Sequence, residues 1–389
     1  MSGLKIVADE NIPALEETFS DLGEIVRVPG RGLERGQLKD ADILLVRSVT
    51  RVDEALLAGT PVRFVGSCTI GTDHLDTDWL EARGIAWSAA PGCNANSVVE
   101  YVFCALAALG IDWSRRRFGI VGCGNVGGLL QRRLHALGIP CAVYDPWLPD
   151  NPDSADLETV LRQEVICLHA PLVKGGPHPS LHLIGAEQIA QIGQGAALIS
   201  AGRGAVVDNR ALLKELRVGK RFQTVLDVWE HEPDIDTELL ELVDIGTPHI
   251  AGYSLDGKLA GTRMVREALD QSGFGFVEPL SPVGAAHGRD RRVEDPQGRS
   301  RPWAAPGRTA PTRALANSSR IFDLLLQIYD PRTDDQRLRA AARGPLPMAK
   351  AFDQLRREYP ERMEFSHYRI EDAALSEDQR RQLAILGLR

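Results

Sequence analysis

The chain alternates short apolar runs with amphipathic segments, as expected for a parallel sheet covered by helices. Four runs in its N-terminal part predict buried strands: LKIVA (4–8), ILLV (43–46), RFVG (63–66) and IAWS (85–88). Between the first two, ENIPALEETFSDLG predicts a helix with Asn11 as its cap, Pro13 in its first turn and Gly23 at its end. This βαβ pattern predicts a doubly wound α/β domain.

A second series of the same kind follows a long apolar helix that is predicted from Asn96 onwards (SVVEYVFCALAALG). Its predicted strands are FGIVG, CAVYD, VICLHA, ALISA, TVLDVW and VDIGT. Two helices between them, NVGGLLQRRLHALG and NRALLKELRVG, each end at a glycine. The pattern predicts the α/β class with two doubly wound parallel-sheet domains and a cleft between them.

The amino-acid composition of the chain changes after about Leu280. Residues 281–316 contain seven Arg and five Pro without a Lys, which predicts an irregular linker. IFDLLLQIYD (321–330) and AFDQLRREYP (351–360) then restore amphipathic helix patterns. We therefore expect residues 317–389 to form a small C-terminal α+β unit.

Composition narrows the class of protein. The 389 residues carry a net charge of −8 and are 43% apolar, which predicts a soluble multi-domain protein and argues against nucleic-acid binding. The amino-terminal run MSGLKIVADENIP lacks the apolar stretch of a secretory signal, and VFCALAALGI (102–111) is too short to span a bilayer. The six cysteines form no C-x-x-C pair, which favours free thiols in a cytoplasmic protein without membrane contact.

A glycine-rich loop predicts a dinucleotide site. GIVGCGNVGG places Gly122, Gly124 and Gly127 in the spacing G-x-G-x-x-G, after an apolar strand and before a helix. Gly122 permits a tight turn, Gly124 lets the backbone approach a pyrophosphate, and Gly127 allows close packing of helix on strand. Asp145 ends the next strand, where a carboxylate accepts hydrogen bonds from ribose hydroxyls and repels a 2′-phosphate. The predicted cofactor is therefore NAD.

Three polar residues follow later strands of the same domain. SAGRGAVVD supplies Arg203, DVWEHEP supplies Glu232 and TPHIAGY supplies His249. Ligands of open α/β sheets bind beyond the carboxyl ends of the strands, so these side chains should face the nicotinamide. Oxidation of a secondary alcohol needs a base for the hydroxyl proton, which a histidine oriented by a carboxylate supplies, and an arginine suits a substrate carboxylate.

The residues alone leave other interpretations open. Arg203 could tie down a helix end, and Glu232 before a proline could cap a loop. His169 in CLHAPL also ends a predicted strand before a proline, so spacing does not choose between His169 and His249. His178 and His182 lie four apart, but flanking prolines argue against a helix that presents both, so no metal site is predicted.

Four motifs together resemble those of the D-isomer-specific 2-hydroxyacid dehydrogenases: GCGNVG, RGAVVD, DVWEHEP and TPHIAG. The resemblance implies that His249 is the acid/base, Glu232 its partner and Arg203 the carboxylate clamp. It also implies a flavodoxin-like substrate domain (1–93 and 251–280), a Rossmann NAD domain (94–250) and a C-terminal dimerisation-type domain (317–389). Further residues implied to contact NAD are Asn125, Val126, Ala170, Ala201, Gly202, Asp227 and Gly252.

Within the family, several segments are similar to the branch that oxidises 4-phospho-D-erythronate in pyridoxal phosphate biosynthesis: VADENIP, LLVRSVT, GTDHLD, SAAPGCNANSVVEYVF, HIAGYSLDGK and YDPRTDD. By position, this resemblance implies that Ser48, Thr69 and Tyr253 bind a small phosphorylated hydroxy acid, and that the protein is a homodimer. His231 departs from the pattern, since the family usually has glycine before the glutamate. A phosphoglycerate dehydrogenase and a non-catalytic NAD-sensing protein remain the alternatives.

Overall fold

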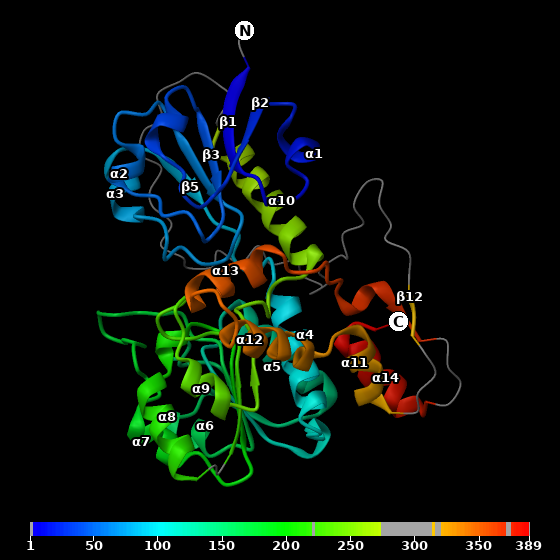
Figure 1. Cartoon of the computed structure of the whole chain (residues 1–389). Coiled ribbons are helices and arrows are strands. Elements are labelled where there is room, and N and C mark those ends of the chain that lie inside the picture. The colour runs from blue at the N-terminus through cyan, green and yellow to red at the C-terminus, as the bar shows by residue number, and fades with distance from the viewer. Residues whose placement is uncertain (1–2, 220–221, 274–312, 316–319, 371–374, 389) are drawn as a thin grey trace. The chain divides into compact units, whose positions relative to one another are not determined.

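The computed structural model describes residues 3–219, 222–273, 313–315, 320–370 and 375–388 (Figure 1). The chain divides into two compact units. The N-terminal unit comprises the described residues of Met1–Cys93 and Lys258–Thr312, and the nucleotide unit those of Asn94–Gly257 and Arg313–Arg389. The chain thus returns to the N-terminal unit at Lys258, and the C-terminal segment belongs to the nucleotide unit. Most of the predicted linker lies outside the described residues.

The N-terminal unit is built on a parallel sheet in the order β2-β1-β3-β4-β5. This is the flavodoxin-like order, which confirms the fold predicted for this part of the chain. Its strands are β1 (Leu4–Asp9), β2 (Gly23–Val28), β3 (Ile43–Val46), β4 (Phe64–Ser67) and β5 (Ala86–Ser88). Its helices are α1 (Leu15–Phe19), α2 (Glu54–Leu57), α3 (Thr77–Ala82), the 3-10 helix η1 (Arg35–Leu38) and α10 (Leu255–Gln271), which enters the unit at Lys258.

Helices cover both faces of this sheet. Ile6 and Ala8 of β1 pack in one buried cluster with Phe19 of α1 and Val265 of α10, which runs beside β1 and β3 in Figure 1. Val7 points to the opposite face, where the cluster includes residues of α2 and α3. Alternate side chains of a strand point to opposite faces, so a fully apolar strand needs cover on both.

The predicted first helix is wrong in its bounds. Ala14, not Asn11, is the N-cap residue of α1, and Asn11 instead donates its backbone N–H to Oδ1 of Asp9 (2.8 Å). Gly23 does not end a helix but begins β2. A Cβ built on Gly23 would lie 1.9 Å from the carbonyl oxygen of Leu4, so glycine is needed where the two strands meet.

The nucleotide unit has a six-stranded parallel sheet in the order β11-β10-β9-β8-β6-β7. A parallel bridge between Val143 of β7 and Ser154 continues the sheet by one position. With that position counted, the order is that of a Rossmann fold, and the switch point lies between β6 and β8. The strands are β6 (Phe118–Val121), β7 (Cys141–Tyr144), β8 (Val165–Leu168), β9 (Ala197–Ser200), β10 (Gln223–Leu226) and β11 (Ile245–Gly246).

The helices of this unit share one core with the C-terminal segment. The predicted long helix is α4 (Ala95–Ala108), and the others before the C-terminal segment are η2 (Trp113–Arg115), α5 (Asn125–Leu137), α6 (Leu157–Leu161), α7 (Ala186–Gln191), η3 (Gly204–Val206), α8 (Asn209–Val218) and α9 (Thr237–Leu242). The C-terminal segment contributes α11 (Ile321–Ile328), α12 (Pro331–Ala342), α13 (Met348–Arg357), η4 (Phe365–His367), α14 (Glu377–Leu386) and the strand pair β12 (Arg313–Ala314) and β13 (Tyr368–Arg369). Leu338 of α12 and Phe352 of α13 belong to the same buried cluster as Leu226 of β10.

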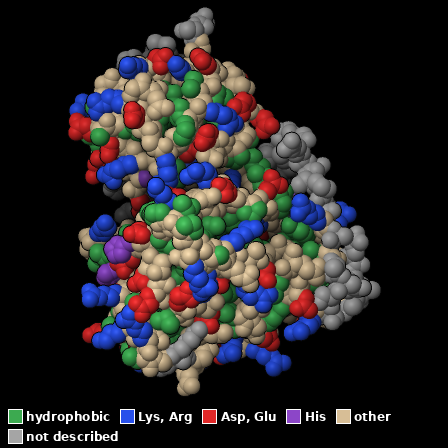
Figure 2. All heavy atoms as spheres, viewed as in Figure 1, with side chains coloured by type: hydrophobic (Ala, Val, Ile, Leu, Met, Phe, Trp, Pro, Cys, Tyr) green, Lys and Arg blue, Asp and Glu red, His purple; other side chains and the backbone are tan. Residues whose placement is uncertain are grey.

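Acidic and basic side chains are interspersed on the face that Figure 2 shows. The six cysteines are free thiols, and Cys68, Cys104, Cys123 and Cys167 are buried. Among the described residues, no helix combines the length and the apolarity needed to cross a membrane.

Candidate active site

The glycine loop joins β6 to α5 in a shape that only small residues permit. Gly122 has φ +83°, and a Cβ there would lie 2.6 Å from the Cα of Ala170. A Cβ on Gly127 would lie 2.0 Å from the carbonyl oxygen of Gly122, whereas one on Gly124 would meet no atom within 4 Å. The loop is therefore close-packed on its inner side and open at Gly124, as the approach of a pyrophosphate requires. Asn125 and Val126 begin α5, and its N-cap residue, Gly124, has no side chain to cap the first N–H groups.

Asp145 follows β7 and braces this loop. The Cys123 backbone N–H donates to Oδ2 of Asp145 (2.8 Å), and the Trp147 N–H donates to Oδ1 (3.0 Å). The carboxylate therefore lies beside the glycine loop, where the ribose of a dinucleotide would bind. The residues at this end of the sheet fit NAD.

The predicted cofactor residues at the ends of β8 and β9 lie against each other. A Cβ on Gly202 would lie 2.8 Å from the carbonyl oxygen of Ala170. Ala201 begins the same turn, and its backbone N–H bonds to the carbonyl of Leu168 (3.2 Å). Ser200, the last residue of β9, has a buried hydroxyl with no hydrogen-bond partner among the described residues.

His249 and Glu232 form a hydrogen-bonded pair. Nδ1 of His249 lies 2.6 Å from Oε2 of Glu232, and Oε1 of Glu232 accepts the backbone N–H of Trp229 (2.8 Å). The two side chains remain 31% and 19% exposed, so solvent or a ligand can reach them. The backbone of His249 has φ +56°, a strained conformation of the kind that clusters at functional sites.

Glu232 is held as a carboxylate. Burial alone would raise its pKa, but His249, the nearby guanidinium of Arg356 and the Trp229 N–H together bring the pKa below its usual range. An ionised Glu232 accepts a hydrogen bond from the Nδ1–H of His249 and leaves Nε2 as the nitrogen that faces other partners.

Asp227 shapes the loop that carries His249. Its Oδ1 accepts the hydroxyl of Thr247 (2.6 Å) and the N–H of Ile250 (2.8 Å), and its Oδ2 accepts the N–H of Ala251 (3.0 Å). The His249 N–H bonds to the Asp227 backbone carbonyl (2.7 Å). Burial raises the pKa of this carboxyl. Asp227 thus fixes the position of His249 from the neighbouring strand, while its predicted contact with NAD stays a prediction.

Arg203 follows β9, next to the strand that leads to Glu232. It donates a hydrogen bond to the carbonyl of Gly202 (3.0 Å). A Cβ on the following residue, Gly204, would lie 1.9 Å from the carbonyl oxygen of Trp229. Because Gly204 has no side chain, the loop that carries Arg203 packs directly on the turn that carries Glu232.

His169 differs from His249 in its burial and in its hydrogen-bond partners. Both of its ring nitrogens are buried and have no hydrogen-bond partner among the described residues. Burial lowers its pKa to about 4. An imidazole with so low a pKa is a weak base, and no carboxylate among the described residues pairs with this ring to stabilise its charged form, so the geometry favours His249.

Gly252 and Tyr253 lie on the turn after His249. A Cβ on Gly252 would lie 2.0 Å from Nδ2 of Asn94, so this turn is packed against the start of α4. The ring of Tyr253 packs edge-on against Tyr359 (5.7 Å between centroids), and the guanidinium of Arg356 lies 5.4 Å from the Tyr253 ring centroid. Arg356 was missed by the sequence analysis, since no motif surrounds it.

Ser48 and Thr69 belong to the N-terminal unit. They follow β3 and β4, which are adjacent strands, so both lie at the same edge of that sheet. Ser48 is exposed, and the hydroxyl of Thr69 lies 2.9 Å from that of Ser67. Their predicted contact with the substrate stays a prediction.

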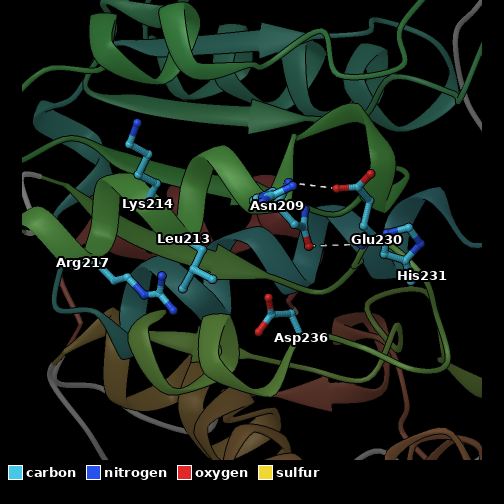
Figure 3. A pocket seen from close by; sticks show the side chains of 8 residues that line it. Asn209, Leu213, Lys214, Arg217, Glu230, His231 and Asp236 are labelled. Carbon is cyan, nitrogen blue, oxygen red and sulfur yellow. Dashed lines mark hydrogen bonds between the residues drawn. The ribbon is translucent and has the colours of Figure 1, made fainter.

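Other polar groups involve residues that are not among the predicted site residues. A pocket of about 460 Å³ is lined by residues of α8 and by Glu230, His231 and Asp236 (Figure 3). Beside it, His182 pairs with Glu230 (2.6 Å) and lies near Asp208, whereas His178 packs on Trp147. The two histidines considered for a metal thus have different partners. His135, Cys141 and Asp153 form a further cluster of potential ligands.

Comparisons with known proteins agree with this geometry. Residues 102–251 match the family described as D-isomer specific 2-hydroxyacid dehydrogenase, NAD binding domain, and residues 308–387 match a domain of unknown function, DUF3410. An erythronate-4-phosphate dehydrogenase of Cellvibrio japonicus is 51% identical over 99% of this chain and 100% of its own length. One of Azotobacter vinelandii is 47% identical over 94% of each chain.

Solved structures share the fold at lower identity. The NAD-bound 3-phosphoglycerate dehydrogenase of Entamoeba histolytica has a TM-score of 0.61 and 22% identity, over 71% of this chain and 98% of its own. D-Lactate dehydrogenase of Aquifex aeolicus, complexed with NAD and lactic acid, has a TM-score of 0.58 and 23% identity, over 69% and 95%. The chain belongs to the D-isomer specific 2-hydroxyacid dehydrogenase family, within the erythronate-4-phosphate dehydrogenases, and is an NAD-dependent enzyme.

Proposed function

We propose that the protein oxidises 4-phospho-D-erythronate to 2-oxo-3-hydroxy-4-phosphobutanoate, a step of pyridoxal 5′-phosphate biosynthesis. The observation that carries the proposal is the His249–Glu232 pair in the same parallel-sheet unit as a Rossmann glycine loop, in a chain 51% identical to an erythronate-4-phosphate dehydrogenase. NAD, when bound, accepts the hydride that leaves C2 of the substrate.

His249 takes the proton of the C2 hydroxyl on Nε2, and the imidazolium is stabilised by Glu232 on Nδ1. Arg203 holds the substrate carboxylate and polarises the carbonyl that forms at C2. Asp145 accepts hydrogen bonds from the ribose hydroxyls of the cofactor. Ser48, Thr69 and Tyr253 bind the rest of the substrate, and their hydroxyls suit a phosphorylated polyol acid.

A substrate panel with NAD tests the proposal. We expect NADH to form with 4-phospho-D-erythronate and much less with D-erythronate, 3-phosphoglycerate or D-lactate. Single-turnover conditions avoid dependence on how NADH is reoxidised. Equal or greater activity with 3-phosphoglycerate would favour a phosphoglycerate dehydrogenase, and NAD binding without turnover on any acid would favour an NAD-sensing protein.

His249→Ala tests the assignment of the base. The variant should bind NAD as the wild type does, because the glycine loop and Asp145 are untouched, and should lose at least about a hundredfold in turnover. His169→Ala serves as the comparison. Retained turnover in His249→Ala would reassign the proton.

We also propose that the protein is cytoplasmic and a homodimer. The free thiols suit a reducing compartment. Light scattering of the purified chain measures its mass in solution, and a monomer at micromolar concentration would contradict the proposed dimer.

A further inference from the structure

The two residues that follow His249 are bound by charged side chains at both their N–H groups and their carbonyl groups. The carboxylate of Asp227 accepts the backbone N–H of Ile250 (2.8 Å) and that of Ala251 (3.0 Å). Arg362 of the C-terminal segment donates from Nη2 to the carbonyl of Ile250 (3.2 Å) and to that of Ala251. The loop that carries His249 is therefore held by an anion at its donors and by a cation at its acceptors.

The guanidinium of Arg362 is itself fixed by its neighbours. It stacks on Tyr329, with 4.4 Å from its central carbon to the ring centroid. The hydroxyl of Ser97 accepts a hydrogen bond from Nη2 (2.7 Å) and donates one to the Ala251 carbonyl (2.8 Å). The main chain of Arg362 is also paired, since its carbonyl accepts the Leu255 N–H (2.8 Å). Stacking and charge-assisted hydrogen bonds together give this side chain one defined position.

The backbone at His249 is of the kind that depends on such contacts. Its φ of +56° is unfavourable for a residue with a Cβ, and such a conformation persists only where the surroundings hold it. The ring has to be held as well, because Nδ1 lies 2.6 Å from Oε2 of Glu232. If the carbonyls at 250 and 251 lost their donor, the loop could relax and carry the ring away from Glu232. A small misplacement of a catalytic group is enough to slow a reaction strongly.

We propose that Arg362 is a positioning residue of the active site: it binds the carbonyls of Ile250 and Ala251 and thereby holds the His249 ring against Glu232. The proposal rests on the proposed role of His249 as the base. Arg362 lies in the segment that matches a domain of unknown function, so part of that segment acquires a role in catalysis.

Arg339 offers a matched control. It also belongs to the C-terminal segment, and it also donates to backbone carbonyls elsewhere in the nucleotide unit, those of Leu240 and Val243. These carbonyls lie before β11, whereas the His249 loop follows β11. Arg339→Met therefore removes a contact of the same kind between the same parts of the chain, at a different loop.

Amide hydrogen exchange tests the proposal without turnover, in the full-length chain. In Arg362→Met, the amides of Ile250 and Ala251 should exchange at least about tenfold faster, which corresponds to the loss of one charge-assisted hydrogen bond. In Arg339→Met, these amides should exchange as in the wild type. Amides of β6 report opening of the whole unit, so a general loss of stability would accelerate β6 and the loop together. Faster exchange confined to the loop supports the proposal, and equal loop exchange in the two variants overturns it.

Kinetics then connect the loop to the chemistry. Arg362→Met should lose about 10- to 100-fold in kcat and keep its affinity for NAD, because the glycine loop and Asp145 are untouched. Arg362→Lys should recover part of kcat, since an ammonium group retains the charge but not the planar fork of the guanidinium. An unchanged kcat in Arg362→Met, despite a loosened loop, overturns the proposal. Failure of the substrate assignment looks different, because the wild type would then also be inactive while the exchange result still stands.

Discussion

Replacing Glu232 by glutamine probes the His249–Glu232 pair, to which we assign the proton transfer. The amide keeps the size of the side chain and an oxygen that can accept the Trp229 N–H, as Oε1 of Glu232 does (2.8 Å). It removes the negative charge that lies 2.6 Å from Nδ1 of His249. The imidazolium formed during alcohol oxidation then loses its counter-charge, so the expected effect falls on turnover and not on NAD binding.

The magnitude follows from the bond that is lost. A hydrogen bond to a charged group contributes about 1.5–3 kcal/mol, roughly twice that of a neutral one. Since about 1.4 kcal/mol corresponds to a tenfold change in rate, Glu232→Gln should lower kcat about 10- to 150-fold. Glu232→Asp keeps the charge at a longer distance and should lose less.

Glu232→Gln should also change how the free energy of unfolding depends on pH. The folded-state pKa of Glu232 is lowered, so its ionisation stabilises the fold above the unfolded value of about 4.3, and this contribution is lost as pH falls through the folded pKa. Denaturant unfolding at neutral pH should show Glu232→Gln to be less stable than the wild type, and the difference should shrink in acid. Equal kcat for the two proteins at neutral pH, with both folded, would refute the assignment of Glu232.

Substitutions at four further positions test the predicted cofactor site and the backbone. Gly127→Ala places a Cβ 2.0 Å from the Gly122 carbonyl and should cost about 1–3 kcal/mol of stability, whereas Gly124→Ala should keep the Tm and lose NAD affinity; equal Tm values for both would contradict the packing argument. His231 has φ +61°, so His231→Gly should exceed His231→Ala in unfolding free energy by about 1 kcal/mol. Asp145→Asn keeps an acceptor for the Cys123 N–H but removes the charge that repels a 2′-phosphate, so the kcat/KM ratio of NADP to NAD should rise about tenfold, and an unchanged ratio would exclude Asp145 from cofactor choice.

The sheets were predictable because their sequence signals are local. Every predicted strand corresponds to a strand of the structure within one or two residues at most bounds, since a strand buried on both faces leaves a run of apolar residues. The glycine loop was predictable for a similar reason: the positive φ of Gly122 and the close approach at Gly127 each exclude a side chain. These constraints act between neighbours in the sequence.

The edge strand β2 was missed because its signal is weak. Only Val28 of GEIVRV is fully buried, so the segment lacks the apolar run of an inner strand. The preceding helix was predicted too long for a related reason. Gly23 has the position of a helix end in the sequence, but it is required by the Leu4 carbonyl of the neighbouring strand, a contact that only the folded sheet creates.

The choice between the two histidines shows the limit of spacing as a guide. His169 and His249 both follow a strand, and the difference between them is tertiary. The ring of His169 is enclosed and has no hydrogen-bond partner in the described part of the chain, whereas that of His249 meets a carboxylate that follows the neighbouring strand. Arg356 extends the point, because no pattern around it suggests chemistry. Its place depends on Phe352 and Leu338, which join the Rossmann core and fix the face that α13 turns toward Tyr253. Apolar residues far from any motif thus hold the C-terminal segment in the core of the nucleotide unit, so truncation of this segment should impair folding and, through it, catalysis.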